Sequence, residues 1–596
     1  MNSINKSKSV AVFAPFAEID KHSSIEWLVT KSISQFNRVI IIRCGKAFND
    51  LCPSMRLHKI SLNSPRGLKS QVCESCITKS RIWDRDLKVN RVEVDYDDLE
   101  SDPELELLLN AKDHLVHPNE IYYSGIPIGN IAAYDLLIEN KILDGRIPRE
   151  KFSEFDLLVK QSWGVFRFFT DFFIENNVRT LIVFDHLYSL NRAAVEAAFR
   201  QNIKVISLGR RPTNNQSEIH VTLDLIDDSL DPTFFRFESW EKFKNLKIKN
   251  SILLDNAQKF LIEKTQQGNL WVYSEPYKRN SMSETLEKLK KHNGLKILIV
   301  LGSGDERTAS EISAGGEGVG FVDQFSWLKH LVGLLTSEDH SKSLIIIRPH
   351  PRLFPNMRDS VGAKQFELYM DFFQLLPNRF IIDLPEYKTP IYSILDEIDL
   401  VINFSSSIGV ESLLWGKPVA ILSQHSSRSY PIECNLLLSD DDIRSLKKDS
   451  DFLMNNFRHH RMMALKWVTF VRNFTQCSLI EEKASSGENE IFQKNNRLLI
   501  NFSFLSQIKS ILRFIVYKFA PKLPILFRIE KYKKFLKNMK SSDLPDILDF
   551  MLNHGIKNVA EFYLLDSKKT NREAFSDYID ESKLEFELTT IVKEIN

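Results

Sequence analysis

Apolar residues occur in short β-branched runs that are separated by longer segments with helical periodicity. Near the start of the chain, strand-like runs at 9–13 and 38–43 flank a helix-like segment at 23–35. The same alternation returns at 180–208, where two strand-like runs flank a helix. Alternating strands and helices are typical of a parallel sheet. The pattern therefore predicts an α/β domain over residues 1–230, with inserts.

A second alternation begins at residue 294 and is more regular. It predicts a nucleotide-binding α/β domain over 294–480, joined to the first by a helical connection over 231–293. A helical C-terminal extension, first basic and then acidic, is predicted over 500–596. The fold class expected is α/β, with two Rossmann-like domains and that extension. The strands predicted for the second domain are 295–301, 343–347, 379–383, 400–403 and 418–422.

Composition narrows the class of protein without deciding it. The chain has 596 residues, 43% hydrophobic and 26% charged, which is typical of a soluble protein with several domains. The net charge of +1 is too small to attract nucleic acid electrostatically, and no nucleic-acid-binding motif is recognised. The first apolar run is too short for a signal peptide, and no 18-residue apolar stretch occurs. A cytoplasmic location is expected.

The segment Arg348-Pro-His-Pro-Arg352 follows a strand-like run, where ligands of parallel sheets bind. Two prolines hold the backbone extended and would fix one imidazole and two guanidiniums at the strand end. Arginine forks suit phosphate, and His350 could donate to a phosphate or stabilise a leaving diphosphate. The alternative is a kinked turn whose arginines pair with surface acids.

Two further strand ends carry polar residues suited to a donor nucleotide. Serines at the start of the helix after 400–403 would offer an anion-binding helix N-terminus, and an acid one turn later could accept from sugar hydroxyls. A Gly-rich loop after 295–301 would allow close approach of a diphosphate. Each feature is also common without any ligand. The donor-binding candidates are Gly302, Ser303, Gly304, Arg348, His350, Arg352, Ser405, Ser406, Ser407 and Glu411.

Together these motifs resemble the capsule and surface-polysaccharide glycosyltransferases that include bacterial Kdo transferases. The resemblance rests on residues 302–306, 324–328, 348–352 and 403–419, and more loosely on 123–129 and 191–192. It implies a GT-B fold, in which a nucleotide-activated sugar is held mainly by the second domain and passed to a growing surface glycan. It also implies that His350 and Ser405–Ser407 hold the donor phosphate and that Glu411 holds donor hydroxyls.

A transferase also needs a base on the facing wall of its cleft. Asp185 and His186, at the end of the run 180–184, are the first candidates, followed by Glu18 and Asp20 after the first strand. The alternative is that all four are ordinary loop residues. No Asp-x-Asp motif stands at a strand end, so no catalytic cofactor or metal is expected.

Four of the six cysteines fall within 33 residues, namely Cys44, Cys52, Cys73 and Cys76. Four thiolates suit a structural zinc ion or an iron–sulfur cluster, although reduced thiols remain the alternative. The stretch 509–540 has ten Lys or Arg and one acid, interleaved with aromatic residues. Contact with an anionic membrane is expected there, which makes the protein peripheral on the inner membrane; a solvated helix pair is the alternative.

The function expected is sugar transfer from a nucleotide donor to a lipid-linked or oligosaccharide acceptor. A teichoic-acid-type glycerophosphotransferase and a nucleotide-sugar epimerase are the alternatives among enzymes. A non-catalytic scaffold of a capsule-assembly complex is the alternative from another class of protein.

Overall fold

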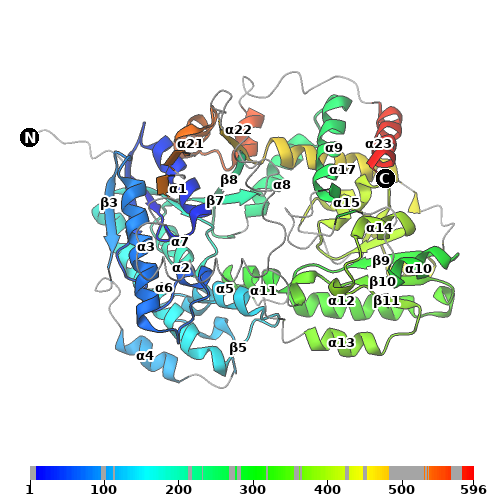
Figure 1. The fold of residues 1–596 in the computed structure, drawn as a ribbon, viewed down its shortest axis with the longest axis horizontal. Helices are drawn as coiled ribbons and strands as arrows, with labels where there is room; N and C mark the ends of the chain where they lie inside the picture. The colour runs from blue at the N-terminus through cyan, green and yellow to red at the C-terminus, as the bar shows by residue number, and fades with distance from the viewer. Residues whose placement is uncertain are drawn as a thin grey trace, which may run out of the picture.

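The computed structural model describes residues 9–95, 102–111, 115–211, 218–230, 232–266, 276–277, 283–316, 320–354, 362, 366–422, 429–447, 453–454, 456–481, 529–530, 533–534, 536–565 and 580–595. Over these residues the chain is an α/β protein with two large sheets, each surrounded by helices (Figure 1). The fold class expected from the alternation of strands and helices is confirmed at this level.

The first sheet has eight strands in the order β16-β15-β8-β7-β6-β1-β2-β3. Its five strands from β7 to β3 are parallel, and the three at the other edge are antiparallel. Every residue of β1 is buried, which explains its continuous apolar run. The strands are β1 (Ser9–Phe13), β2 (Arg38–Cys44), β3 (Asn90–Val94), β6 (Val178–Phe184), β7 (Lys204–Arg211), β8 (Glu218–Ile226), β15 (Cys477–Glu481) and β16 (Met539–Lys540).

The second sheet has six strands, all parallel, in the order β11-β10-β9-β12-β13-β14. From β9 the chain proceeds outward to β10 and β11, then returns to the other side of β9 as β12. The direction of winding therefore reverses beside β9, which is where ligands bind in such sheets. The strands are β9 (Lys296–Val300), β10 (Leu344–Arg348), β11 (Phe380–Ile382), β12 (Leu400–Asn403), β13 (Val419–Leu422) and β14 (Leu436–Leu438).

Helices cover both sheets and connect them. Around the first sheet lie α1 (Asp20–Ile33), α2 (Pro53–Leu57), α3 (Arg66–Asp84), α4 (Pro103–Asn110), α5 (Ile128–Asn140), α6 (Phe152–Glu175) and α7 (Ser189–Arg200). Over the described residues, the second half of the chain has seven α-helices from α10 to α16. They are α10 (Glu284–Lys291), α11 (Gly304–Ser313), α12 (Gly320–Leu335), α13 (Phe366–Gln374), α14 (Ile391–Glu397), α15 (Ile408–Leu414) and α16 (Asp440–Arg444). The Phe-rich pattern belongs to α6, whose Phe169 contacts Phe13 of β1 edge to face at 4.8 Å between ring centroids.

The chain passes between the two sheets more than once. Helices α8 (Pro232–Phe243) and α9 (Asn250–Gln266) lead to the second sheet, and α17 (Phe457–Asn473) leads back to β15, which pairs with β8. Helices α21 (Leu544–His554), α22 (Val559–Leu565) and α23 (Glu581–Ile595) pack on α1, α8 and α9, respectively. Figure 1 shows α21 and α22 beside the first sheet and α23 beside α9. Chain beyond α17 is thus built into both halves.

A second junction joins α11, which follows β9, to α5 from the first half. The Thr308 hydroxyl donates to the Leu143 carbonyl at 2.8 Å, and the Arg192 Nε donates to the Ser313 carbonyl at 3.3 Å. Each of these bonds joins a residue of the first 200 to one beyond 300, and α5 and α11 lie side by side in Figure 1. The polar loop after β9 is therefore placed against the first half of the chain.

Candidate functional site

A pocket of about 790 Å³ lies at the carboxyl ends of β9 and β12. One wall comes from the loop after β9, from α11 and from Phe404 and Ser405 after β12; the other comes from Leu187 after β6 and from Ser229 and Leu230 after β8. Its size and position are those of a site for a drug-sized or nucleotide-sized ligand. Among the lining residues are Gly302, Ser303, Gly304, Glu306, Arg307, Ser310, Glu311, Gln324 and Ser429.

The Gly-rich loop lies in this pocket, as predicted for a close-approach loop. Gly302 donates its N–H to Gln324 Oε1 at 2.8 Å, and a Cβ on Gly302 would lie 3.1 Å from the Phe404 carbonyl oxygen. A side chain at position 302 would therefore be tightly packed against the strand end of β12. Gly304 begins α11, so the positive end of that helix opens at the pocket.

Only the first of the three serines after β12 lines the pocket. Ser405 has a left-handed backbone, φ +57°, and its carbonyl accepts from the Ser429 hydroxyl at 2.8 Å. Ser406 is buried and donates its N–H to Asn403 Oδ1 at 3.2 Å. Ser407 precedes α15, is exposed, and donates its hydroxyl to Glu411.

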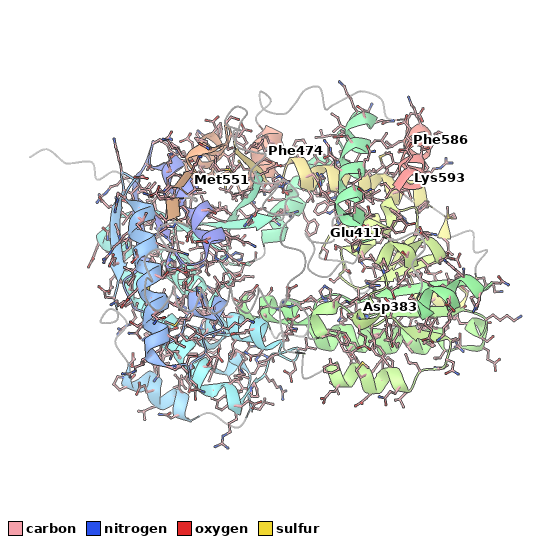
Figure 2. All side chains as sticks on the ribbon, in the orientation of Figure 1. Asp383, Glu411, Phe474, Met551, Phe586 and Lys593 are labelled. Carbon is pink, nitrogen blue, oxygen red and sulfur yellow. The ribbon has the colours of Figure 1, made fainter. Side chains whose placement is uncertain are left out.

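Glu411 is held inside the protein rather than in the pocket. Its side chain is 3% exposed, and Oε1 lies 2.8 Å from the Lys264 ammonium of α9. Oε2 accepts the Tyr392 hydroxyl at 2.8 Å. Figure 2 labels Glu411 and Asp383 on the side of the second sheet. The sequence pattern predicted that Glu411 accepts hydrogen bonds from donor hydroxyls, but its contacts are those of a buried ion pair. Nothing in the sequence indicated that Lys264 would be its partner.

The Arg348–Arg352 loop makes its ion pairs within the protein. Arg348 donates to Asp383 at 2.5 Å and to the Thr389 carbonyl, while Arg352 donates to Asp305 at 2.6 Å and to the Ile138 carbonyl. This is the arrangement of the alternative interpretation, except that the acids are buried and not on the surface. Neither arginine is among the residues that line the pocket.

His350 is neutral at ordinary pH. Burial lowers its pKa to about 4, and the charges of Arg352 and Arg348 act in the same direction. Its Nδ1 accepts the Arg352 N–H at 3.2 Å, which caps the short 3-10 turn from Pro351 to Leu353. A neutral imidazole whose Nδ1 accepts must carry its proton on Nε2. His350 thus serves the turn, and it too is absent from the pocket lining.

Of the residues proposed for the facing wall, Asp185 and His186 each bond to a residue that lines the pocket. Asp185 follows β6 with a left-handed backbone, φ +57°, and Oδ1 accepts the N–H of the pocket residue Leu187 at 3.1 Å. Burial raises the pKa of Tyr134 well above its usual range, and the charges of Asp185 and of the pocket residue Glu306 contribute. Asp185 therefore lies next to the pocket residue Leu187, although it is not itself among the lining residues.

His186 is a buried connector. Its Nδ1 lies 3.0 Å from the Ser207 hydroxyl and its Nε2 lies 3.0 Å from the carbonyl of Leu230, which lines the pocket. Burial lowers its pKa, so the ring is neutral at physiological pH. With both nitrogens engaged, the ring positions the loop after β8 and is poorly placed to accept a proton from a ligand.

Glu18 and Asp20 lie in a separate ionic cluster. The Glu18 carboxylate accepts from Ser75 at 2.8 Å and lies 3.1 Å from Lys79 and 3.3 Å from His58. Burial opposes the charge of Glu18, but the bond from His58 and the charge of Lys79 hold its pKa below the usual value. Asp20 shares Lys79 at 3.1 Å. Neither acid lines the pocket.

The sequence interpretation missed the polar face of α11. Ser303, Arg307, Ser310 and Ala314 line the pocket at intervals of three or four residues, and Glu311, which also lines it, lies four residues after Arg307. Arg307 Nε donates to Glu311 at 2.9 Å, and its guanidinium lies 5.2 Å from the Phe404 ring centroid. The helical spacing after the Gly-rich loop was the available signal, because it places these side chains on one face.

The four clustered cysteines line one small pocket, together with Phe16 and Phe48. Burial raises the pKa of Cys44, Cys73 and Cys76 to about 11, and that of Cys52 also rises, so all four are thiols at neutral pH. Over the described residues, which include these four, no group of three or more Cys, His, Asp or Glu side chains is arranged to hold a metal ion. The four cysteines thus lie close together, but their side chains are not arranged to coordinate a metal ion.

Most of the basic stretch 509–540 lies outside the described residues. Over the part of the chain that is described, no helix is long and apolar enough to cross a membrane.

No protein-family model matches the chain, and no curated protein matches it. The beta Kdo 2,4 transferase KpsC of Thermosulfurimonas dismutans is 14% identical over 41% of this chain and 69% of that one, with a TM-score of 0.26. The UDP-GlcNAc 2-epimerase of Neisseria meningitidis, bound to UDP-GlcNAc, is 14% identical over 78% and 96%, with a TM-score of 0.24. MurG of Acinetobacter baumannii is 10% identical over 78% and 95%, with a TM-score of 0.21. At TM-scores this low, none of these likenesses establishes the fold family or the activity of this chain.

Proposed function

We propose that the chain is a glycosyltransferase of the GT-B kind, which moves a sugar from a nucleotide-activated donor to a surface glycan. The observation that carries the proposal is the pocket at the carboxyl ends of β9 and β12, whose second wall comes from the first sheet. A transfer reaction needs two substrates to meet, and a pocket with walls from two sheets provides one face for each.

The resemblance of residues 302–306 and 403–419 to the Kdo-transferase group supports the same proposal, because residues of both segments line this pocket. The division proposed is a first α/β domain over 1–230, a helical connection over 231–293, a donor-binding domain over 294–480 and a C-terminal extension over 500–596. The proposed location is cytoplasmic and peripheral on the inner membrane, where a lipid-linked acceptor would be reached.

The donor's phosphates are proposed to lie against Gly302–Gly304 and the start of α11, with Arg307 as their cation. Backbone N–H groups and the helix dipole favour an anion there, and a guanidinium binds phosphate through two parallel N–H bonds. Arg307 is 20% exposed and shares its charge with Glu311, so a phosphate could replace that partner. Arg352 is proposed to support this site from behind through Asp305, and His350 through the turn that holds Arg352. Arg348 is proposed to support the start of the same loop through Asp383.

Asp185 is proposed as the base on the facing wall. In this reaction the acceptor hydroxyl attacks the anomeric carbon, Asp185 takes its proton, and the nucleotide leaves with the bonding electrons of the broken C–O bond. The carboxylate of Glu306, which is 52% exposed and lies in the same pocket, is the second candidate. General bases contribute about 10²–10⁴-fold to rate. No metal or other cofactor is proposed for this step.

A thermal-shift screen with CMP-, UDP-, GDP- and CDP-linked sugars tests donor binding. One donor is expected to stabilise the protein by about 2.7 kcal/mol at 100 times its Kd. Arg307→Ala should weaken that donor about 10-fold or more. Arg81→Ala is the matched control, because Arg81 is an exposed arginine paired with Glu93 on the first sheet. Equal loss in both variants, or no stabilising donor, would contradict the proposal.

Product analysis then separates the reactions. Transfer to an acceptor supports the glycosyltransferase, release of an epimerised nucleotide sugar would replace it with an epimerase, and transfer of a phosphoglycerol unit would make it a glycerophosphotransferase. Donor binding without turnover of any kind would favour the scaffold. Asp185→Asn should lower kcat about 10²-fold or more while the donor Kd changes less than about threefold.

A further inference from the structure

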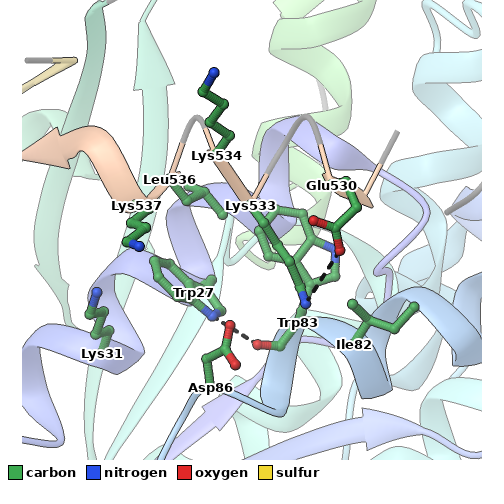
Figure 3. A pocket seen from close by; sticks show the side chains of 10 residues that line it. All are labelled: Trp27, Lys31, Ile82, Trp83, Asp86, Glu530, Lys533, Lys534, Leu536 and Lys537. Carbon is green, nitrogen blue, oxygen red and sulfur yellow. Dashed lines mark hydrogen bonds and ion pairs between the residues drawn. The ribbon is translucent and has the colours of Figure 1, made fainter. Parts of the chain in front are cut away.

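A second pocket has a volume of about 870 Å³ (Figure 3). It is lined by residues of α1, of the end of α3 with Asp86 just after it, and of the C-terminal segment that includes Glu530 and Lys537. Its lining combines apolar and basic side chains, with few acids. The lining residues are Trp27, Lys31, Ile82, Trp83, Asp86, Glu530, Lys533, Lys534, Leu536 and Lys537. None of them lines the donor pocket.

The floor of this pocket is rigid and apolar. The Trp27 indole N–H donates to the Trp83 carbonyl at 2.9 Å, and the two rings meet edge to face at 6.4 Å between centroids. Both tryptophans and Leu536 are buried and belong to the core on that face of the first sheet. Because these side chains are already held in place, they need not rearrange when a ligand enters, and the ligand gains apolar contact at little cost in conformational entropy.

The rim of the pocket is basic. Four lysines line it against two acids, Asp86 and Glu530, and the Lys533 ammonium lies 3.9 Å from Glu530. Lys31 and Lys537 are exposed, and in the view of Figure 3 they lie on the same side of Trp27. The Lys31 ammonium lies 4.8 Å from the Trp27 ring centroid. The surplus of positive charge is therefore adjacent to the apolar floor.

A ligand that fits both features is anionic at one end and apolar at the other. We propose that this pocket binds an anionic lipid of a membrane surface, with its phosphate among Lys31, Lys533, Lys534 and Lys537 and the start of an acyl chain on Trp27 and Leu536. Lysine ammonium groups bind phosphate as point charges, and indole rings are favoured where water meets a lipid layer. The sequence leading to the pocket is also basic and aromatic, with five Lys or Arg and no acid over 509–528.

This proposal rests on the peripheral membrane location proposed above, but not on the reaction proposed for the donor pocket. A protein that binds lipid here may have any activity at the other pocket, and a transferase without this lipid site would still bind its donor. The thermal-shift screen above and the vesicle experiment below therefore fail or succeed separately.

Flotation of the full chain with vesicles tests the proposal. Wild type is expected to float with vesicles of phosphatidylcholine containing 30 mol% phosphatidylglycerol and to stay unbound with phosphatidylcholine alone. The double variant Lys31→Glu/Lys537→Glu should weaken vesicle binding at least about 10-fold, because basic residues near an anionic surface each contribute several-fold. Lys290→Glu/Lys291→Glu on α10 is the matched control, since it reverses the same number of exposed lysines elsewhere.

Equal binding by wild type and both double variants would overturn the proposal, because binding would then come from other basic residues. Absence of wild-type binding, or equal weakening in both variants, would also overturn it. Competition by soluble glycerol 3-phosphate at millimolar concentration would identify a free phosphate ester, and not a lipid, as the occupant.

Tryptophan quenching locates the lipid. Phosphatidylglycerol brominated in its acyl chain should quench part of the wild-type fluorescence, and Trp27→Phe should remove a measurable share of that quenching when the two proteins are compared at equal amounts of vesicle-bound protein. Quenching that is unchanged in Trp27→Phe would place the lipid elsewhere and contradict the proposal.

Discussion

Arg352 and Asp305 form a buried ion pair, 2.6 Å from Nε to Oδ2, that joins the loop after β10 to the first turn of α11. Both side chains are 3% exposed or less. Arg352 also donates to the Ile138 carbonyl, which belongs to α5 on the other side of the junction. One guanidinium therefore connects the loop, the helix that lines the pocket and the first half of the chain.

Removal of this guanidinium should be costly. Arg352→Met is expected to lower the free energy of unfolding by about 3–5 kcal/mol, because it leaves Asp305 buried without its countercharge. The double variant Arg352→Met/Asp305→Asn should recover at least about 1 kcal/mol of that loss. Urea unfolding measures both, with the exposed Arg81→Ala as the control that stays within about 0.5 kcal/mol. A single variant as stable as wild type would show that the pair does not hold the junction.

Stability should depend on pH through His350. Its pKa is about 4 in the folded protein against 6.5 in the unfolded chain, so the unfolded chain takes up a proton first as the pH falls. Folding stability from this group is full above pH 6.5 and is lost between pH 6.5 and 4. His350→Gln should remove a component on the order of 2 kcal/mol from that decline, since the ring is partly buried.

The comparison for His350 is the slope of unfolding free energy against pH, measured for wild type and variant between pH 4 and 7. His330→Gln is the control, because His330 is exposed and pairs with Asp440 on the surface. Identical slopes in wild type and His350→Gln would contradict the pKa assigned to this imidazole.

The Lys264–Glu411 pair provides a test of whether Glu411 is structural. Glu411→Gln should lower the free energy of unfolding by about 3 kcal/mol or more, since the ammonium of Lys264, itself 8% exposed, would lose its countercharge. Lys264→Met should show a comparable loss. If Glu411 instead binds donor hydroxyls, its variant would raise the donor Kd strongly while Lys264→Met leaves that Kd unchanged. Isothermal titration with the donor found in the screen distinguishes the two outcomes.

The cysteine pocket should be inert at neutral pH. Thiols with a pKa of about 11 are almost entirely protonated at pH 8, so their reaction with a disulfide reagent such as DTNB should be roughly 100-fold slower than that of an exposed thiol. Unfolding in urea should release all six. Elemental analysis of chelator-free protein is expected to find less than 0.1 equivalent of zinc, and a value near one would restore the structural metal.

Periodicity was sufficient to predict most of the second sheet, because β9, β10, β12 and β13 are buried almost throughout and read as continuous apolar runs. The edge strand β14, which is partly exposed, was not predicted. The position of the pocket also followed from the sequence, since Gly302–Gly304 and Ser405 stand where strands end. The ion-pair partners of the charged residues could not be predicted from the sequence. Lys264 lies 147 positions before Glu411, and Asp305 lies 47 before Arg352, so no local pattern connects them. Tertiary packing determines which charged residues form buried ion pairs. A sequence motif therefore cannot show whether its charged side chains are available to bind a ligand.

The crossing of the chain after α17 has a consequence for any shortened form of this protein. Strand β15 pairs with the first four of the nine residues of β8, and two residues of β16 pair with β15 in turn. A protein that ends before residue 477 would expose the backbone donors and acceptors of β8, and exposed strand edges recruit other chains. Deletion of 505–596 would remove β16 and the helices that pack on α1, α8 and α9. Loss of solubility in such a deletion would report an uncovered sheet edge, and point substitutions are the sounder route to every function argued above.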